Sequence, residues 1–216
     1  MSILSLAAIT WDIDLYRWIH IGLHRDWLDK LMLLFTYTGD GHIQIPLLLA
    51  ACVWKKTRPY GLAVLACYVF VGGVRLILRD LFSRPRPTNL DFSQPVSWGA
   101  GMPEWLAKTF DIIPYGDSSF PSGHSATSFA VAFMLAWLLQ GTKHAWIGWL
   151  AVVWSFLVGF SRIYIGVHYP GDVLGAAGLA LAGSAGLYLF WKKRGLGPFT
   201  PSQKSPEPGT ADTAAL

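Results

Sequence analysis

Five long apolar runs constrain the fold of this chain more than any other feature of its 216 residues. A transmembrane helix needs about 20 predominantly apolar residues. Runs of this kind lie at about 28–54, 60–78, 123–139, 145–160 and 173–191. The composition agrees, since only 14% of the residues are charged, against roughly 25% in an ordinary soluble domain. We therefore predict an all-α, polytopic membrane bundle of about five to six transmembrane helices, and exclude a soluble domain, a disordered chain and a nucleic-acid binder.

The beginning of the chain departs from this simple pattern. The first run is interrupted at residues 38–41 and at Pro46, so it predicts either one bent helix or two short pieces. Before it, residues 12–24 mix apolar and charged side chains, which is typical of an amphipathic helix at the membrane interface. His20 and His24 have a spacing that can bind a metal, but no third ligand is near in sequence, so we interpret them as part of a solvated interfacial face.

These features divide the chain into three parts. Residues 1–27 form the N-terminal interfacial segment, residues 28–194 form the membrane domain, and residues 195–216 form a cytoplasmic tail. The tail is rich in Pro, Ser, Thr and Gly, a composition that predicts disorder.

Basic residues indicate the orientation in the membrane. With five spans, three basic groups fall on one side: Lys55, Lys56 and Arg58; Lys143; and Lys192, Lys193 and Arg194. Cytoplasmic loops carry an excess of Lys and Arg, so this side is predicted to be cytoplasmic. The N-terminus and the connections near residues 81–122 and 161–172 then lie on the outer side.

The first of three polar segments on the outer side is residues 79–87, where three arginines fall within eight residues. Charges beside a membrane segment are costly and mark functional sites. Guanidinium groups match phosphate oxygens in a bidentate fashion. The segment is therefore either an anion site or an interfacial basic patch, and alone it favours neither interpretation.

The second polar segment, residues 119–125, begins the third apolar run. Pro, Ser and Gly before that run predict a helix N-terminus, whose free backbone N–H groups favour an anion. Ser122 can add a hydroxyl, Gly123 lets a ligand approach the backbone, and His124 falls in the first helical turn. We interpret this segment as part of an anion site.

The third polar segment, residues 161–172, is the turn between the last two runs and adds the cation Arg162. His168 and Asp172 are four residues apart, close enough to face each other if the turn opens into a helix. A carboxylate on one imidazole nitrogen fixes the tautomer and leaves the other nitrogen free to attack.

Together the three segments supply cations for phosphate, a nucleophile with an orienting acid, and a second histidine for proton delivery. No cluster of Asp and Glu with metal-ligand spacing accompanies them. The combination predicts phosphoryl transfer without a metal or another cofactor.

The three segments resemble the signature of the type 2 phosphatidic acid phosphatase superfamily, K-x6-R-P, P-S-G-H and S-R-x5-H-x3-D. The matching residues are Arg79 with Arg86-Pro87, then Pro121-Ser122-Gly123-His124, and then Ser161-Arg162, His168 and Asp172. Arg79 stands where the family usually has Lys, so we expect a phosphate pocket of different shape. The signature spans residues 79–172, and the helix layout extends the resemblance over about 28–191.

The resemblance implies a role for each residue. His168 would attack phosphorus to form a phosphohistidine, Asp172 would orient it, and His124 would protonate the leaving oxygen and then help to activate water. The phosphate oxygens would be held by Arg79, Arg86, Ser122, the backbone N–H of Gly123, and Arg162. Because one histidine must be neutral and the other charged, the resemblance also implies a bell-shaped pH dependence.

The resemblance further implies a lipid phosphate or diphosphate as substrate, at the periplasmic face of the inner membrane. The layout is similar to that of bacterial undecaprenyl-diphosphate phosphatases, so undecaprenyl diphosphate is the first expectation. Phosphatidylglycerophosphate or phosphatidate comes next, followed by lipid A as the substrate of a phosphatase or phosphotransferase. The loop at 82–120 is long enough for a lid, and its tryptophans equally suit interfacial anchoring. Arg84 is predicted to contact a head group or a loop.

Two alternatives come from other classes of protein. A membrane anion transporter needs polar residues along its path, and the apolar runs offer few, chiefly Asp40 and Gln44. A soluble haloperoxidase that binds vanadate shares the anion-site pattern, but the five apolar runs argue against it. The sequence leaves the oligomeric state open.

Overall fold

The computed structural model describes residues 3–96 and 118–199, and its regular elements there are helices apart from one isolated β-bridge. The α-helices are α1 (Ile3–Arg17), α2 (Asp26–Thr38), α3 (Gly41–Val53), α4 (Arg58–Leu81), α6 (Gly123–Leu139), α7 (Ala145–Tyr164) and α8 (Pro170–Arg194). Three short helical elements complete the set: η1 (Trp18–Gly22), η2 (Pro87–Asn89) and η3 (Gly197–Phe199). The predicted all-helical class is confirmed.

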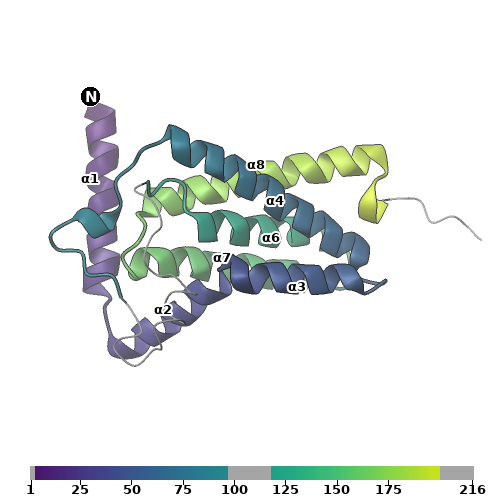
Figure 1. Ribbon diagram of the computed structural model, residues 1–216, viewed down its shortest axis with the longest axis horizontal. Coiled ribbons are helices and arrows are strands. Elements are labelled where there is room, and N and C mark those ends of the chain that lie inside the picture. Colours follow the sequence, from purple (N-terminus) through teal and green to yellow (C-terminus); the bar gives the residue numbers. More distant parts are fainter. Residues whose placement is uncertain (1–2, 97–117, 200–216) are drawn as a thin grey trace, which may run out of the picture.

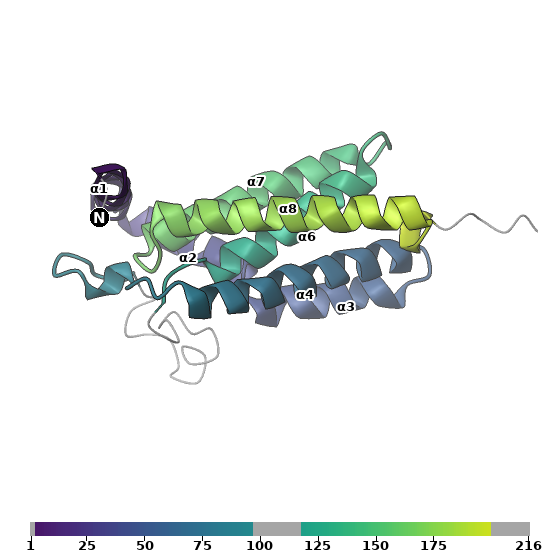
Figure 2. The same cartoon turned by 90° about the horizontal axis from the view of Figure 1, so that it is seen from above.

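Five apolar helices form the bundle at the centre of the fold. Helices α4, α7 and α8 are long and apolar enough to cross a membrane, and α3 and α6 are shorter apolar helices. Figures 1 and 2 show all five running along the long axis of the molecule. Small residues allow close approach between them. At Gly148 of α7, a Cβ atom would lie 2.6 Å from the Cα of Ala136 in α6.

Several helices extend beyond the apolar runs. Helix α4 covers Arg58 to Leu81, α7 continues to Tyr164, and α8 covers Pro170 to Arg194. Helices α4 and α8 each carry proline in the first turn, where its missing N–H costs no intrahelical hydrogen bond. The extra turns place polar residues of the first and third segments on helix ends rather than in loops.

The first apolar run forms two helices, which settles the choice between one bent helix and two short pieces. Helix α2 ends at Thr38, and Asp40 caps α3 by accepting a hydrogen bond from the backbone N–H of His42 at 2.7 Å. Gly39 lies at the break, where a Cβ atom would come within 2.4 Å of a Val158 methyl in α7. The break therefore packs closely against the bundle and holds Asp40 inside it.

The N-terminal segment lies across one end of the bundle (Figure 1). Helix α1 runs into the π-helical turn η1 instead of forming one helix over 12–24. His20 is buried and its Nδ1 lies 2.7 Å from the carbonyl oxygen of Tyr164, so our interpretation of His20 as a solvated residue is wrong. A group of side chains that could bind a metal is formed instead by His24, Asp26 and Asp29. Their nitrogen and oxygen atoms lie within 4.8 Å of one another.

The opposite end gathers the α3–α4 connection, the α6–α7 connection and the end of α8, as Figure 2 shows. The three predicted basic groups therefore lie at one end. Within the predicted tail, η3 is an ordered turn, because the ring of Phe199 packs edge-on against Tyr188 at 5.3 Å. Residues 200–216, and residues 97–117 of the loop at 82–120 that we predicted as a lid or an anchor, lie outside the described residues.

Candidate active site

The turn between α7 and α8 presents His168 to Asp172. The Nδ1 atom of His168 lies 3.4 Å from Oδ2 of Asp172, the predicted contact. The same oxygen accepts the backbone N–H of Tyr169 at 2.9 Å, which closes the first turn of α8. Gly166 has φ = 88°, a conformation that favours glycine, and it lets the turn pass against the ring of His20. This arrangement leaves Nε2 as the imidazole nitrogen of His168 that does not face Asp172.

Two buried guanidinium groups lie beside this histidine. The Nη1 atom of Arg86 is 3.4 Å from Nε2 of His168 and also donates to the carbonyl oxygen of Val167 at 3.2 Å. Arg162 donates through Nη1 to the hydroxyl of Thr36 at 2.8 Å. Its buried Nε has no hydrogen-bond partner among the described residues. Because an unpaired buried donor is costly, this N–H is suited to an anion that enters the site.

The surroundings keep His168 uncharged. Burial lowers its pKa to about 3, and the charges of Arg162 and Arg86 act in the same direction against the opposing effect of Asp172. At neutral pH the imidazole is therefore neutral, the form that a nucleophile requires.

The second segment begins α6 and is tied directly to the third. Ser122 is the N-cap residue, and its backbone N–H donates to the carbonyl oxygen of Asp172 at 3.2 Å. Its buried hydroxyl accepts a hydrogen bond from Ser125 at 2.9 Å. The β-bridge between Pro85 and Ser118 brings the first segment alongside. The predicted phosphate-binding residues Arg86, Ser122, Gly123 and Arg162 therefore lie on adjoining elements around His168.

His124 has a carboxylate partner that the sequence analysis did not assign. Its Nε2 lies 3.4 Å from Oδ2 of Asp40, which reaches it from the break between α2 and α3. Burial alone would raise the pKa of Asp40, but hydrogen bonds with His124 and with the backbone of His42 hold it well below its usual range. Each histidine of the site thus faces an ionised carboxylate.

The position of Asp40 in the sequence carried a usable signal. A charged residue inside an apolar run is expensive in a membrane and indicates a functional site. We counted it as part of a helix interruption and as one of the few polar residues in the apolar runs, because nothing local in the sequence connects residue 40 with residue 124.

Arg79, predicted to bind phosphate, forms an ion pair on α4 and makes no hydrogen bond with either histidine in the described part of the chain. Its Nε pairs with Asp80 at 3.2 Å, and its side chain is one-third exposed. Arg75, one helical turn earlier, instead donates through Nε to the carbonyl oxygen of Pro121 at 3.1 Å. A Cβ atom on Gly123 would lie 3.3 Å from the Arg75 guanidinium carbon. Arg75 falls within an apolar run, which is why the sequence pattern did not single it out.

A cavity of about 340 Å³ opens next to His124, between α3, α4 and α6. Arg75 and His124 lie at one part of its wall, and Gly72, Val69 and Leu76 supply apolar wall. The cavity is therefore polar beside the site and apolar along α4.

Arg84 bridges the N-terminal segment and the site. It donates to Oδ1 of Asp172 at 2.8 Å and to the carboxylate of Asp12, and its guanidinium lies 4.2 Å from the ring centroid of Tyr169. Asp12 also accepts the backbone N–H of Gly171 at 2.7 Å. We predicted that Arg84 contacts a head group or a loop, but its partners are two buried carboxylates on α1 and α8.

We expect Arg84→Leu to lower the free energy of unfolding by about 3 kcal/mol, because it leaves buried carboxylates uncompensated. The same substitution in an Asp172→Asn background should cost at least about 1 kcal/mol less, since one of those charges is already absent. Denaturant unfolding in detergent measures both costs. Equal costs in the two backgrounds would show that Arg84 does not compensate Asp172.

Comparison with known proteins adds four findings. The model of the PAP2 superfamily matches residues 60–196. The undecaprenyl-diphosphatase BcrC of Bacillus subtilis is 30% identical over 174 residues, 78% of each chain. The lipid A 4′-phosphatase of Bacteroides thetaiotaomicron is 29% identical over 178 residues, covering 79% of this chain and 71% of that one. A crystal structure of a transmembrane PAP2-type phosphatidylglycerolphosphate phosphatase from Bacillus subtilis superposes with a TM-score of 0.68, at 26% identity over 87% of each chain.

Proposed function

The chain belongs to the PAP2 superfamily of membrane lipid phosphatases, and on this premise we propose that it hydrolyses undecaprenyl diphosphate to undecaprenyl phosphate and inorganic phosphate. The observation that carries the proposal is the pairing of each site histidine with a carboxylate, His168 with Asp172 and His124 with Asp40, around buried guanidinium groups. The similarity to the undecaprenyl-diphosphatase BcrC over most of both chains supports this substrate.

In the first chemical step, Nε2 of His168 attacks the terminal phosphorus. A nitrogen–phosphorus bond forms as the bond between phosphorus and the bridging oxygen breaks. His124 donates its proton to that leaving oxygen, and Asp172 stabilises the charge that develops on His168. Arg86 and Arg162 hold the non-bridging oxygens, whose charge is greatest in the transition state.

In the second step, water attacks the phosphohistidine. His124, now neutral, accepts a proton from the water while the nitrogen–phosphorus bond breaks. Inorganic phosphate leaves, and His168 returns to its neutral form. The groups that meet the phosphate in this scheme are guanidinium and backbone N–H donors, so the reaction needs no metal ion to balance its charge.

The position of Arg75 favours a diphosphate over a monoester. It lies beside Gly123 and lines the cavity next to His124, the proposed proton donor to the leaving group. A diphosphate substrate releases a phosphate-bearing lipid, and a cation on the leaving-group side stabilises that second anion. The apolar wall formed by Val69, Gly72 and Leu76 suits the first part of the lipid chain.

We also propose that the site faces the periplasm from the inner membrane. The site lies at the end of the bundle opposite the three basic groups. Positively charged ends remain on the cytoplasmic side of membranes, which supports this orientation.

A substrate panel tests the proposal directly. Purified protein in detergent with EDTA is given undecaprenyl diphosphate, phosphatidylglycerophosphate, phosphatidate and lipid A, and phosphate release is measured with and without an acceptor lipid. We expect one phosphate per undecaprenyl diphosphate, at a kcat/KM about tenfold or more above the other substrates. Faster release from phosphatidylglycerophosphate would reassign the substrate, and dependence on the acceptor would make the protein a phosphotransferase. Loss of activity in EDTA would contradict the metal-free mechanism.

The variant Arg75→Gln tests whether Arg75 distinguishes a diphosphate from a monoester substrate. A charge-assisted hydrogen bond contributes about 1.5–3 kcal/mol, so turnover of the diphosphate should fall by roughly 10- to 100-fold. Turnover of phosphatidate, whose leaving group carries no phosphate, should change much less. A similar loss on both substrates would show that Arg75 holds the transferred phosphate or only the α6 N-terminus.

A further inference from the structure

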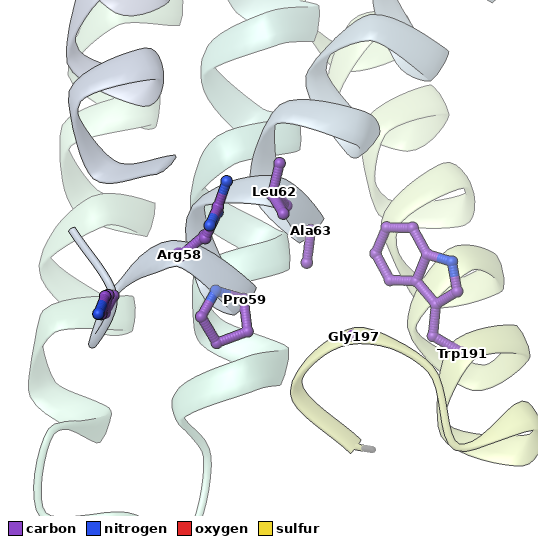
Figure 3. Close-up of a pocket in the computed structure, with 7 residues that line it drawn as sticks. Arg58, Pro59, Leu62, Ala63, Trp191 and Gly197 are labelled. Atoms are coloured by element: carbon purple, nitrogen blue, oxygen red, sulfur yellow. The ribbon is translucent and has the colours of Figure 1, made fainter. Parts of the chain in front are cut away.

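A second cavity lies at the end of the bundle opposite the active site. It has a volume of about 310 Å³ and lies between the start of α4 and the end of α8, with η3 across its floor. Figure 3 shows Trp191 on one side, facing Leu62 and Ala63 across the opening, with Arg58 and Pro59 on the α4 side. Lys55 also lines this cavity.

Among the residues that the structure describes, no acidic side chain is paired with the cations of this cavity. Lys55 and Arg58 are exposed, and neither is in an ion pair with a described residue. The acidic residues of the described ranges are Asp12, Asp14, Asp26, Asp29, Asp40, Asp80, Asp91 and Asp172. They lie on the N-terminal segment, at the α2–α3 break, or on elements at the active-site end. The end of α8 adds Lys192, Lys193 and Arg194, so this end of the described molecule is uniformly positive.

The apolar part of the wall points to a lipid rather than to a free anion. Pro59, Leu62 and Trp191 line the cavity beside the two cations. The side chains of Leu62 and Trp54, close by in sequence, are more than half exposed, as expected of residues that face acyl chains. Basic pockets at the ends of transmembrane helices bind anionic head groups, and aromatic rings lie at the level of those head groups.

We propose that this cavity binds one acidic phospholipid, with its phosphate between Lys55 and Arg58 and the start of its acyl chain along Leu62 and Trp191. The lipid joins the first turn of α4 to the last turns of α8. Binding to the folded state alone stabilises a protein by mass action, so the lipid raises the stability of the α4–α8 pair. This site is separate from the substrate site and does not depend on which lipid is hydrolysed.

The test compares the wild type with the double variant Lys55→Ala/Arg58→Ala. Lys30→Ala/Lys143→Ala removes the same charge outside the cavity and is the matched control. Each protein is purified in neutral detergent and mixed with equal amounts of phosphatidylglycerol and phosphatidylcholine, and the retained lipid is measured by native mass spectrometry. Excess inorganic phosphate is included to displace any lipid from the active site.

We expect the wild type and the control to retain phosphatidylglycerol about tenfold or more over phosphatidylcholine, and the double variant to lose this preference. Phosphatidylglycerol should also raise the Tm of the wild type but not of the double variant. If the double variant does not fold, Arg58→Gln replaces it and should weaken retention several-fold. Equal retention of phosphatidylglycerol by the wild type and the double variant would overturn the proposal. Loss of phosphatidylglycerol from the wild type when phosphate is added would overturn it as well.

Discussion

Replacing His168 by glutamine is expected to lower kcat on the lipid substrate by about 10⁴-fold or more, because the proposed mechanism has no other nucleophile. Residues that act as one catalytic unit show losses of this order when a single member is removed. The imidazole is buried, lies 3.4 Å from both Asp172 and Arg86, and is neutral at pH 7 through its lowered pKa of about 3. Steady-state phosphate release measures the loss.

Two comparisons separate a lost nucleophile from a damaged fold. His168→Gln should fail equally on the lipid and on p-nitrophenyl phosphate, because both need the nitrogen that attacks phosphorus. Its Tm should stay close to that of the wild type, since glutamine occupies a similar volume and removes no charge at neutral pH. A His168→Gln enzyme with more than about one-tenth of wild-type activity would remove His168 from the mechanism.

Asp40→Asn is expected to slow the lipid reaction by roughly 10- to 100-fold, while p-nitrophenyl phosphate turnover changes less than about threefold. General acid catalysis contributes about 10²- to 10⁴-fold where the leaving group needs a proton. The nitrophenolate leaving group does not need one. Asp40 does not contact His168, so the attack itself is left intact. The difference between the two substrates therefore reports on protonation of the leaving oxygen through His124.

The pH dependence of kcat is a second measurement on Asp40→Asn. The charged groups that face His124 are Asp40 from the α2–α3 break, Arg75 from α4 and Arg162 from α7. Asp40 itself also faces His42 and Tyr68. Removing the Asp40 carboxylate leaves Arg75 and Arg162 as the charged groups around His124. In Asp40→Asn, His124 therefore loses its proton at a lower pH than in the wild type. The alkaline limb of kcat should move down by about one pH unit or more.

Asp14→Asn is the matched control, because this exposed aspartate on α1 lies outside the site. It should leave both substrates and the pH profile unchanged. A loss of equal size on the lipid and on p-nitrophenyl phosphate in Asp40→Asn, with no displacement of the alkaline limb, would assign Asp40 a purely structural role.

The sequence predicts those parts of the site that depend on short spacing. His168 and Asp172 are four residues apart, and a helix that begins between them brings the two side chains together. Pro121, Ser122 and Gly123 similarly predict the N-terminus of α6, because each residue suits a helix start. The apolar runs predict the bundle, since length and hydropathy decide which segments can span a membrane.

Other parts depend on packing between distant segments. Asp40 meets His124 only because the first run breaks at Gly39 and closes against Val158. Arg75, and not Arg79, reaches the start of α6 because of the rotation of α4 against that helix. Arg84 lies between Asp172 of α8 and Asp12 of α1 and donates a hydrogen bond to each carboxylate. Asp12 reaches this position because α1 lies across the end of the bundle. None of these contacts produces a motif or a periodic pattern in the sequence, because the residues that form each contact lie far apart along the chain.

The most direct test of the mechanism is to trap the phosphorylated enzyme. The wild type is mixed with undecaprenyl diphosphate labelled in its terminal phosphate, quenched within the first turnover in alkali, which preserves phosphohistidine, and digested for mass spectrometry. We expect one labelled phosphate on His168, no label in His168→Gln, and slower loss of the label in His124→Gln. A rapid first turnover with no label on His168, or a label on another residue, would contradict it.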